Sequence, residues 1–339
     1  MTRATGDTHP STSGHGTPDG RACSVLWDDD GTSAFGTAAR AGFFVLLEQP
    51  GPWGRDAARD SHLDPQVGAE LDARCGAAGG RFMLIRRPGG HPARDRPHRV
   101  LVAWTGGGTS ARGSSGPVAP WLLGADLAHP GELLTMDWAA LSRGSRSLVA
   151  ASLPSAEEVA PTLLVCTNGR RDVCCAVRGR PLAAAAARLA PGRAWEVSHT
   201  GGHRFAPTAV LLPWGQTYAR LDEESVEWVL GAALSGHTPL ELLGATHDRG
   251  RAPLSPDAQC AESFVREQLG ETALRALSTA EVEADGLDDR TTAAVVSHED
   301  GRTWLVHVRW EQAGLSRPES CGKKPVPVVT RQATVVSAT

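Results

Sequence analysis

The stretch that most restricts the fold of this chain is residues 162–234. A short apolar run at 162–165 predicts a buried strand, and a helical segment is expected to open at Cys174 and Cys175. The alanine-rich segment from Pro181 to Ala190 predicts a helix, with Pro181 suited to a first turn and Pro191-Gly192 ending it. Further strands are expected at 194–197 and 208–212, with a helix from about 222 to 234. The order of strand, helix, strand, strand, helix therefore predicts a small α/β domain.

This order is compatible with a thioredoxin-like domain, although order alone also fits other small α/β folds. The preceding part alternates strand patterns with a helix that begins near Pro65, and the last ninety residues contain a Ser255-capped helix and a half-buried strand at 303–310. We therefore expect an α/β (α+β) protein with four segments: a disordered tail (1–22), an N-terminal α/β region (23–155), the thioredoxin-like domain (156–245) and a C-terminal α+β extension (246–339).

Composition narrows the classes of partner and compartment. The 339 residues carry a net charge of −4, which offers no broad positive surface for nucleic acid or an anionic membrane. No run approaches the roughly eighteen apolar residues of a membrane span, so we expect a cytoplasmic protein. The seven cysteines are scattered along the chain, which favours metal or redox chemistry over a disulfide framework.

Five metal-binding side chains are expected to converge at one end of the central sheet: Cys166, Cys174, Cys175, His199 and His203. Thiolate and imidazole together suit zinc, copper or an iron–sulfur centre. The loop after Cys166 is longer than the two to four residues of a zinc knuckle, so it can enclose a larger group such as a binuclear iron–sulfur cluster. Adjacent side chains generally diverge, so only one of the two neighbouring cysteines is expected to take part.

The motifs CTNGRRDVCC and WEVSHTGGHRFAP closely resemble those of the sucrase/ferredoxin-like family, whose cluster domain is a thioredoxin-like ferredoxin. The resemblance implies a [2Fe-2S] cluster bound by Cys166, Cys175, His199 and His203, and it leaves Cys174 without a role. It also implies electron transfer to a redox partner protein that the sequence does not identify. Hydrolysis of sucrose is not expected, because no carboxylate pair is singled out by its spacing.

Two neutral imidazoles in place of two thiolates should raise the reduction potential, and an imidazole that faces solvent should couple reduction to proton uptake. Five arginines near the motifs could dock an acidic partner or an anionic substrate: Arg170, Arg171, Arg178, Arg180 and Arg204. The chief alternative is a structural zinc module that uses the same side chains. A dithiol oxidoreductase and a site without any metal are weaker alternatives. The roles of Cys174 and Cys321, enzymatic activity and oligomeric state remain open at this stage.

Overall fold

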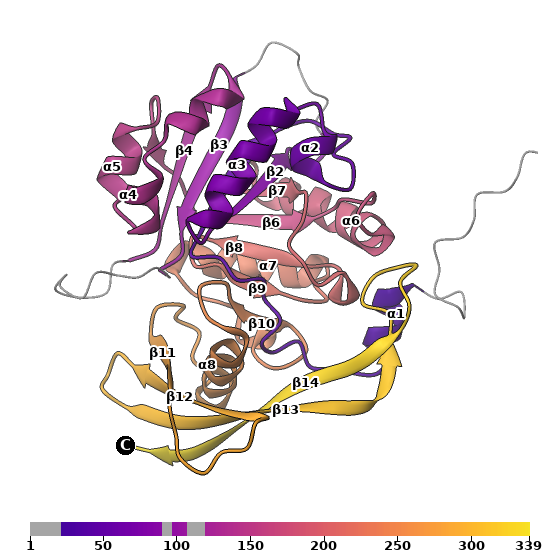
Figure 1. Ribbon diagram of the computed structural model, residues 1–339, viewed down its shortest axis with the longest axis vertical. Coiled ribbons are helices and arrows are strands. Elements are labelled where there is room, and N and C mark those ends of the chain that lie inside the picture. The colour runs from indigo at the N-terminus through magenta and orange to yellow at the C-terminus, as the bar shows by residue number, and fades with distance from the viewer. Residues whose placement is uncertain (1–21, 90–96, 107–118) are drawn as a thin grey trace, which may run out of the picture.

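The computed structural model describes residues 22–89, 97–106 and 119–339 (Figure 1). Except for Ala22, the predicted tail lies outside these ranges. Ten strands of the described residues form one mixed sheet in the order β10-β9-β8-β6-β7-β2-β1-β3-β4-β5, and four more form a separate sheet. The prediction of an α/β protein is therefore confirmed.

The first half of the large sheet is built around β1. This strand pairs with β2 in parallel and with β3 antiparallel, and β3 continues to β4. The elements of this part are β1 (Phe43–Glu48), α2 (Ala57–Asp60), α3 (Pro65–Ala77), β2 (Arg81–Arg86), β3 (His98–Trp104), β4 (Trp121–Leu127), η1 (Pro130–Thr135), α4 (Trp138–Ser142), α5 (Arg146–Ala151) and β5 (Glu157–Glu158).

The second half repeats this arrangement around β6. Here β6 pairs with β7 in parallel and with β8 antiparallel, and β8 continues to β9. Its elements are β6 (Thr162–Cys166), α6 (Val173–Leu189), β7 (Ala194–Val197), η2 (His203–Phe205), β8 (Ala209–Leu212), β9 (Gln216–Tyr218), α7 (Glu223–Ala232), η3 (Ala233–Ser235), η4 (Leu240–Leu242) and β10 (Asp248–Arg251).

The two halves are related by an approximate twofold axis at the antiparallel pairing of β2 with β7. In this pairing Ile85 lies opposite Val197, and these residues are the partners of Glu48 on β1 and Cys166 on β6. Glu48 thus occupies in the first half the position that Cys166 occupies in the second. The thiol and imidazole motifs are present in the second half alone, so the first half supports the site without duplicating it.

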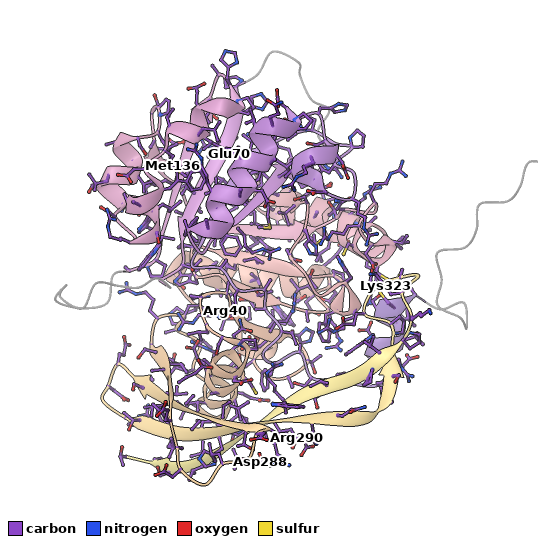
Figure 2. The ribbon with its side chains drawn as sticks, in the orientation of Figure 1. Arg40, Glu70, Met136, Asp288, Arg290 and Lys323 are labelled. Carbon is purple, nitrogen blue, oxygen red and sulfur yellow. The ribbon has the colours of Figure 1, made fainter. Side chains whose placement is uncertain are left out.

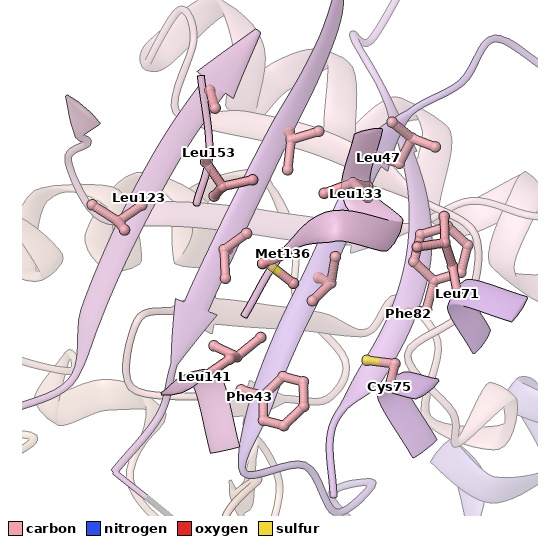
Figure 3. Close-up of a cluster of buried hydrophobic side chains, with 14 of the residues drawn as sticks. Phe43, Leu47, Leu71, Cys75, Phe82, Leu123, Leu133, Met136, Leu141 and Leu153 are labelled. Carbon is pink, nitrogen blue, oxygen red and sulfur yellow. The ribbon is translucent and has the colours of Figure 1, made fainter. Parts of the chain in front are cut away.

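Buried apolar side chains pack the sheet of each half against its helices, and they also pack the two halves against each other. In the first half, α3 and the helices after β4 cover one face of the sheet, with Phe43, Leu71 and Met136 at the centre of the cluster (Figure 3). The opposite faces of β1 and β6 share a further cluster that includes Phe44, Leu164 and Cys166. Cys166 is therefore held in a core to which both halves contribute.

The C-terminal part adds α8 (Pro256–Leu269) and a four-stranded antiparallel sheet (Figure 1). Ser255 caps α8 by accepting a hydrogen bond from the Ala258 N–H at 3.2 Å, as its position before a proline predicts. The strands are β11 (Leu277–Val282), β12 (Thr291–His298), β13 (Thr303–Arg317) and β14 (Val326–Ala338). The loop between β13 and β14 lies beside α1 (Cys23–Asp29), so the first helix of the described chain meets a loop near its C-terminal end in sequence.

The helix before β7 begins close to Cys174, as expected, and it also contains the alanine-rich segment, so Pro181 does not lie in a first turn. α6 starts at Val173, after Asp172, whose carboxylate accepts a hydrogen bond from the Cys174 N–H at 2.9 Å. Pro181 lies inside this helix. The capping aspartate and the buried face of the longer helix outweigh the backbone hydrogen bond that an internal proline removes.

The sheet also crosses the expected domain boundaries. β5, just after residue 155, pairs with β4, and β10, just after residue 245, pairs with β9. The three parts of the chain therefore share continuous hydrogen-bonded structure. None of the helices in the described ranges is long and apolar enough to cross a membrane.

Candidate metal centre

The four side chains that the motifs single out lie together at the end of β6 and β7. Cys166 is the last residue of β6, Cys175 lies in the first turn of α6, and His199 and His203 flank the loop after β7. Cys175 Sγ is 3.2 Å from His203 Nδ1, and the two imidazole rings stack with their centroids 4.9 Å apart. Two parallel strands bring these groups together because their carboxyl ends meet at one edge of the sheet.

The Cys166 thiol lies at the centre of this group and is 1% exposed. A hydrogen bond from the Cys175 thiol, with further bonds from His199 and the Thr200 N–H, holds the pKa of Cys166 well below its usual value, although burial opposes this. A thiolate is the form that binds a metal. The surroundings of Cys166 therefore favour the form that a metal would require.

Both imidazoles are kept neutral by their surroundings. Burial lowers the pKa of His199 to about 4, and the positive charges of Arg81 and Arg171 act in the same direction, while Cys166 opposes them. Burial also lowers the pKa of His203. A neutral imidazole has a free lone pair for a metal, and His199 Nδ1 is buried without a hydrogen-bond partner in the described residues.

The depressed pKa of His199 predicts how the stability of the metal-free protein depends on pH. In the unfolded chain the His199 imidazole takes up a proton near pH 6.5, whereas in the folded protein it does so only near pH 4. The contribution of neutral His199 to folding stability is therefore complete above pH 6.5 and is lost as the pH falls toward 4. We expect His199 to account for a loss of about 2 to 3 kcal/mol between pH 7 and 4.5. Urea unfolding of the wild type and of His199→Asn would measure this. Equal losses in both proteins would refute the assignment.

Two arginines, of which Arg249 is buried and Arg81 partly buried, hold the histidine loop by its carbonyl groups. Arg81 on β2 donates to the carbonyl oxygens of His199 and Thr200, at 3.1 and 3.2 Å. Arg249 on β10 donates to the carbonyl oxygen of Gly201 at 3.0 Å. Gly202 has a φ of 71°, and a Cβ there would overlap the Arg249 guanidinium. Glycine at this position thus permits both the left-handed turn and the close approach of the arginine.

Another glycine sets the distance between α6 and the end of β6. A Cβ on Gly179 would overlap the backbone carbonyl oxygen of Cys166, which cannot move aside as a flexible side chain could. The absence of a side chain at this point allows the helix that carries Cys175 to lie directly against the strand that carries Cys166.

Gly179→Ala is therefore expected to lower the free energy of unfolding by about 2 to 3 kcal/mol, because the helix must move away from Cys166. Gly231 on α7 provides a matched control, since nothing lies within 4 Å of the Cβ that alanine would add. Gly231→Ala should leave stability unchanged or raise it by about 0.5 to 1 kcal/mol. Urea unfolding of both variants tests this contrast, and equal effects would contradict it.

Cys174 points away from Cys175 and joins a different group. Its Sγ lies 3.2 Å from Cys321 Sγ and 3.5 Å from Cys23 Sγ. The sequence assigned no role to Cys174 and none to Cys321, because these cysteines follow no metal-binding spacing along the chain. Among the described residues, Cys23, Asp172, Cys174 and Cys321 form a group whose ligand atoms all lie within 4.8 Å of one another, so they could hold a metal ion.

A hollow on the surface reaches His199. Its lining includes three arginines, Arg55, Arg81 and Arg171, and three aspartates, Asp56, Asp60 and Asp72. Two other arginines of the expected docking surface are engaged within the protein: Arg178 pairs with Asp28 at 2.6 Å and Arg204 with Glu319 at 3.0 Å. The hollow next to His199 is therefore of mixed charge.

The fold and the site define an α/β protein in which the second of two similar halves carries a thiol–imidazole centre. Residues 113–242 match the family model described as Sucrase/ferredoxin-like. The family indicated by the motifs is thus confirmed for this part of the chain, which contains Cys166, Cys175, His199 and His203. The family name points to a ferredoxin-like redox role. No curated protein and no solved structure matches the chain significantly.

Proposed function

We propose that Cys166, Cys175, His199 and His203 bind a [2Fe-2S] cluster and that the protein transfers single electrons. The observation that carries this proposal is the convergence of two thiols and two neutral imidazoles from three separate segments, with Cys175 Sγ 3.2 Å from His203 Nδ1. The cluster supplies one-electron oxidation and reduction. The protein supplies its ligands, its burial and its charge.

The donor atoms fit a group larger than one ion. Among the described residues, the group with all ligand atoms within 4.8 Å of one another consists of Cys23, Asp172, Cys174 and Cys321. The four proposed cluster ligands do not form a group that compact. A mononuclear tetrahedral site would bring all four donors close together, whereas a binuclear cluster separates them into pairs. The Nδ1 of His199 is buried without a hydrogen-bond partner among the described residues, so it is free to bind an iron of the proposed cluster.

The charges around the site favour a comparatively high reduction potential. Two neutral imidazoles carry two fewer negative charges than two thiolates, so adding an electron is easier. The Arg249 guanidinium is 1% exposed and interacts electrostatically with Cys166 and Cys175. A buried positive charge at this position further stabilises the reduced, more negative form.

The hollow beside His199 is the proposed contact for a redox partner protein. Three arginines and three aspartates line it, so its charge by itself selects neither an acidic nor a basic partner. His199 lines the same hollow, so a proton can reach its imidazole from solvent when the site is reduced. Reduction is therefore expected to be coupled to proton uptake at a histidine.

The first experiment is an absorption spectrum of anaerobically purified protein before and after dithionite, with iron, sulfide and zinc analysis. About two irons and two sulfides per chain, with visible bands that bleach on reduction, support the proposal. The structural zinc module would be favoured by a protein that stays colourless after anaerobic reconstitution and contains zinc that is lost when Cys166 is replaced. A midpoint potential that stays constant from pH 6 to 10 would exclude the proton coupling.

A further inference from the structure

A second group of metal-binding side chains lies on the other side of the α6 N-terminus. Cys23 is the first residue of α1, Cys174 lies in the first turn of α6, and Cys321 lies in the loop between β13 and β14. Their sulfur atoms form a triangle with sides of 3.5, 3.2 and 3.5 Å. Cys23 and Cys174 are 0% and 2% exposed, so this is a buried cluster of thiols from three distant parts of the chain.

Asp172 completes the group with a carboxylate held in a fixed orientation. Its Oδ1 accepts the Cys174 N–H at 2.9 Å, and its Oδ2 accepts the Ser320 hydroxyl at 2.7 Å and the Cys321 N–H at 2.9 Å. The two oxygens lie 4.0 and 3.9 Å from Cys23 Sγ. The backbone of two of the cysteines thus positions the carboxylate against the third.

This arrangement matches the requirements of a tetrahedral zinc ion. Zinc–sulfur bonds of about 2.3 Å separate the sulfurs of such a site by about 3.8 Å, a few tenths more than the distances in this cluster. Three thiolates and one carboxylate form a closed set of ligands of the type that holds structural zinc. The N–H groups on Asp172 and the N-terminus of α6 offset part of the negative charge.

We propose that Cys23, Cys174, Cys321 and Asp172 bind one zinc ion, separate from the centre formed by Cys166, Cys175, His199 and His203. This site connects three segments that side-chain contacts already bring together. Trp27 donates to the Pro318 carbonyl at 3.0 Å, and Arg178 on α6 pairs with Asp28 on α1 at 2.6 Å. Figure 1 shows α1 beside the loop between β13 and β14, and Figure 2 labels Lys323 in this loop.

The zinc ion has a structural role in this proposal. Cys174 and Cys175 are neighbours on α6, and their side chains serve different sites. Zinc bound to Cys174 fixes the first turn of the helix and thereby positions Cys175. It also closes the N- and C-terminal segments over this end of the molecule. The zinc site does not depend on the identity of the group bound at Cys175.

Metal analysis of the full chain, grown with added zinc and purified without chelator, tests the proposal. We expect about one zinc ion per wild-type chain, and its loss in Cys23→Ala and in Cys321→Ala. Cys75→Ala and Cys260→Ala are matched controls, because both cysteines are buried in the apolar core and lie outside the two centres. A double variant, Cys166→Ala with His199→Ala, should retain its zinc. Loss of zinc in this variant alone would overturn the proposal.

X-ray absorption at the zinc edge of the wild type decides the question even if the cysteine variants fail to fold. Three sulfurs at about 2.3 Å and one oxygen support the proposed ligands, whereas two sulfurs and two nitrogens would place zinc at the Cys166 centre and refute it. A chain that binds no zinc after reduction and addition of zinc chloride would also refute it. So would a disulfide between Cys174 and Cys321 in the freshly isolated protein, detected by alkylation and mass spectrometry.

Discussion

Replacement of both His199 and His203 by cysteine is expected to lower the midpoint potential of the proposed cluster by roughly 200 mV or more. The change adds two thiolate charges to a buried site, and a more negative centre accepts an electron less readily. The same variant should lose the dependence of its potential on pH, because it no longer has an imidazole to protonate. Potentiometric titration at several pH values measures both effects.

The control for this experiment is Cys75→Ala, which changes a buried cysteine in the apolar cluster of the first half (Figure 3). It should keep the wild-type potential and pH dependence. Iron content must be measured in parallel, so that only chains with an assembled cluster are compared. A double-cysteine variant with a full cluster and an unchanged potential would show that the histidines are not ligands.

Arg249→Met is expected to lower the free energy of unfolding by about 3 kcal/mol. The guanidinium is fully buried, and its hydrogen bonds satisfy the carbonyl oxygens of Thr37 and Gly201 and the hydroxyl of Thr37. Methionine fills much of the volume but leaves these acceptors without donors. Arg249→Lys should restore little of the loss, because an ammonium group cannot reproduce the planar set of donors.

Arg309 on β13 provides the comparison. It pairs with Asp288 at 2.6 Å, but both side chains are about half exposed, and such surface pairs contribute at most about 1 kcal/mol. Arg309→Met should therefore be nearly neutral in the same urea unfolding experiment. Similar losses for the two arginines would mean that Arg249 does not hold the histidine loop as its contacts imply.

Arg249 also shows why much of the site's support could not be predicted from the sequence. The motif around the histidines is local, but the arginine that holds their loop lies on β10, forty-eight positions from Gly201. Burial lowers the pKa of Arg249 to about 9, and the positive charges of Arg204 and Arg81 act in the same direction. Only the packing of β10 against the loop places it there.

The fold shows the same division between local and long-range information. Local sequence patterns located β6 and α8 well, because both are specified by neighbouring residues: β6 by an apolar run and α8 by Ser255 before a proline. The relation between the two halves was not predictable, since it depends on the pairing of β2 with β7 across more than one hundred residues. The opening of α6 near Cys174 was predicted, but Pro181 lies inside this helix and not in a first turn.

The sequence by itself determined the α/β class and indicated the residues of the thiol–imidazole centre. Cys166 ends one strand, the two histidines follow the neighbouring parallel strand, and Cys175 lies at the start of the helix between these strands. The tertiary structure alone decided the cluster of Cys23, Cys174 and Cys321. These cysteines are 147 to 298 positions apart, and no local spacing records their meeting. The first centre follows from short-range backbone geometry, whereas the second exists only because α1 and the loop between β13 and β14 pack on the N-terminus of α6.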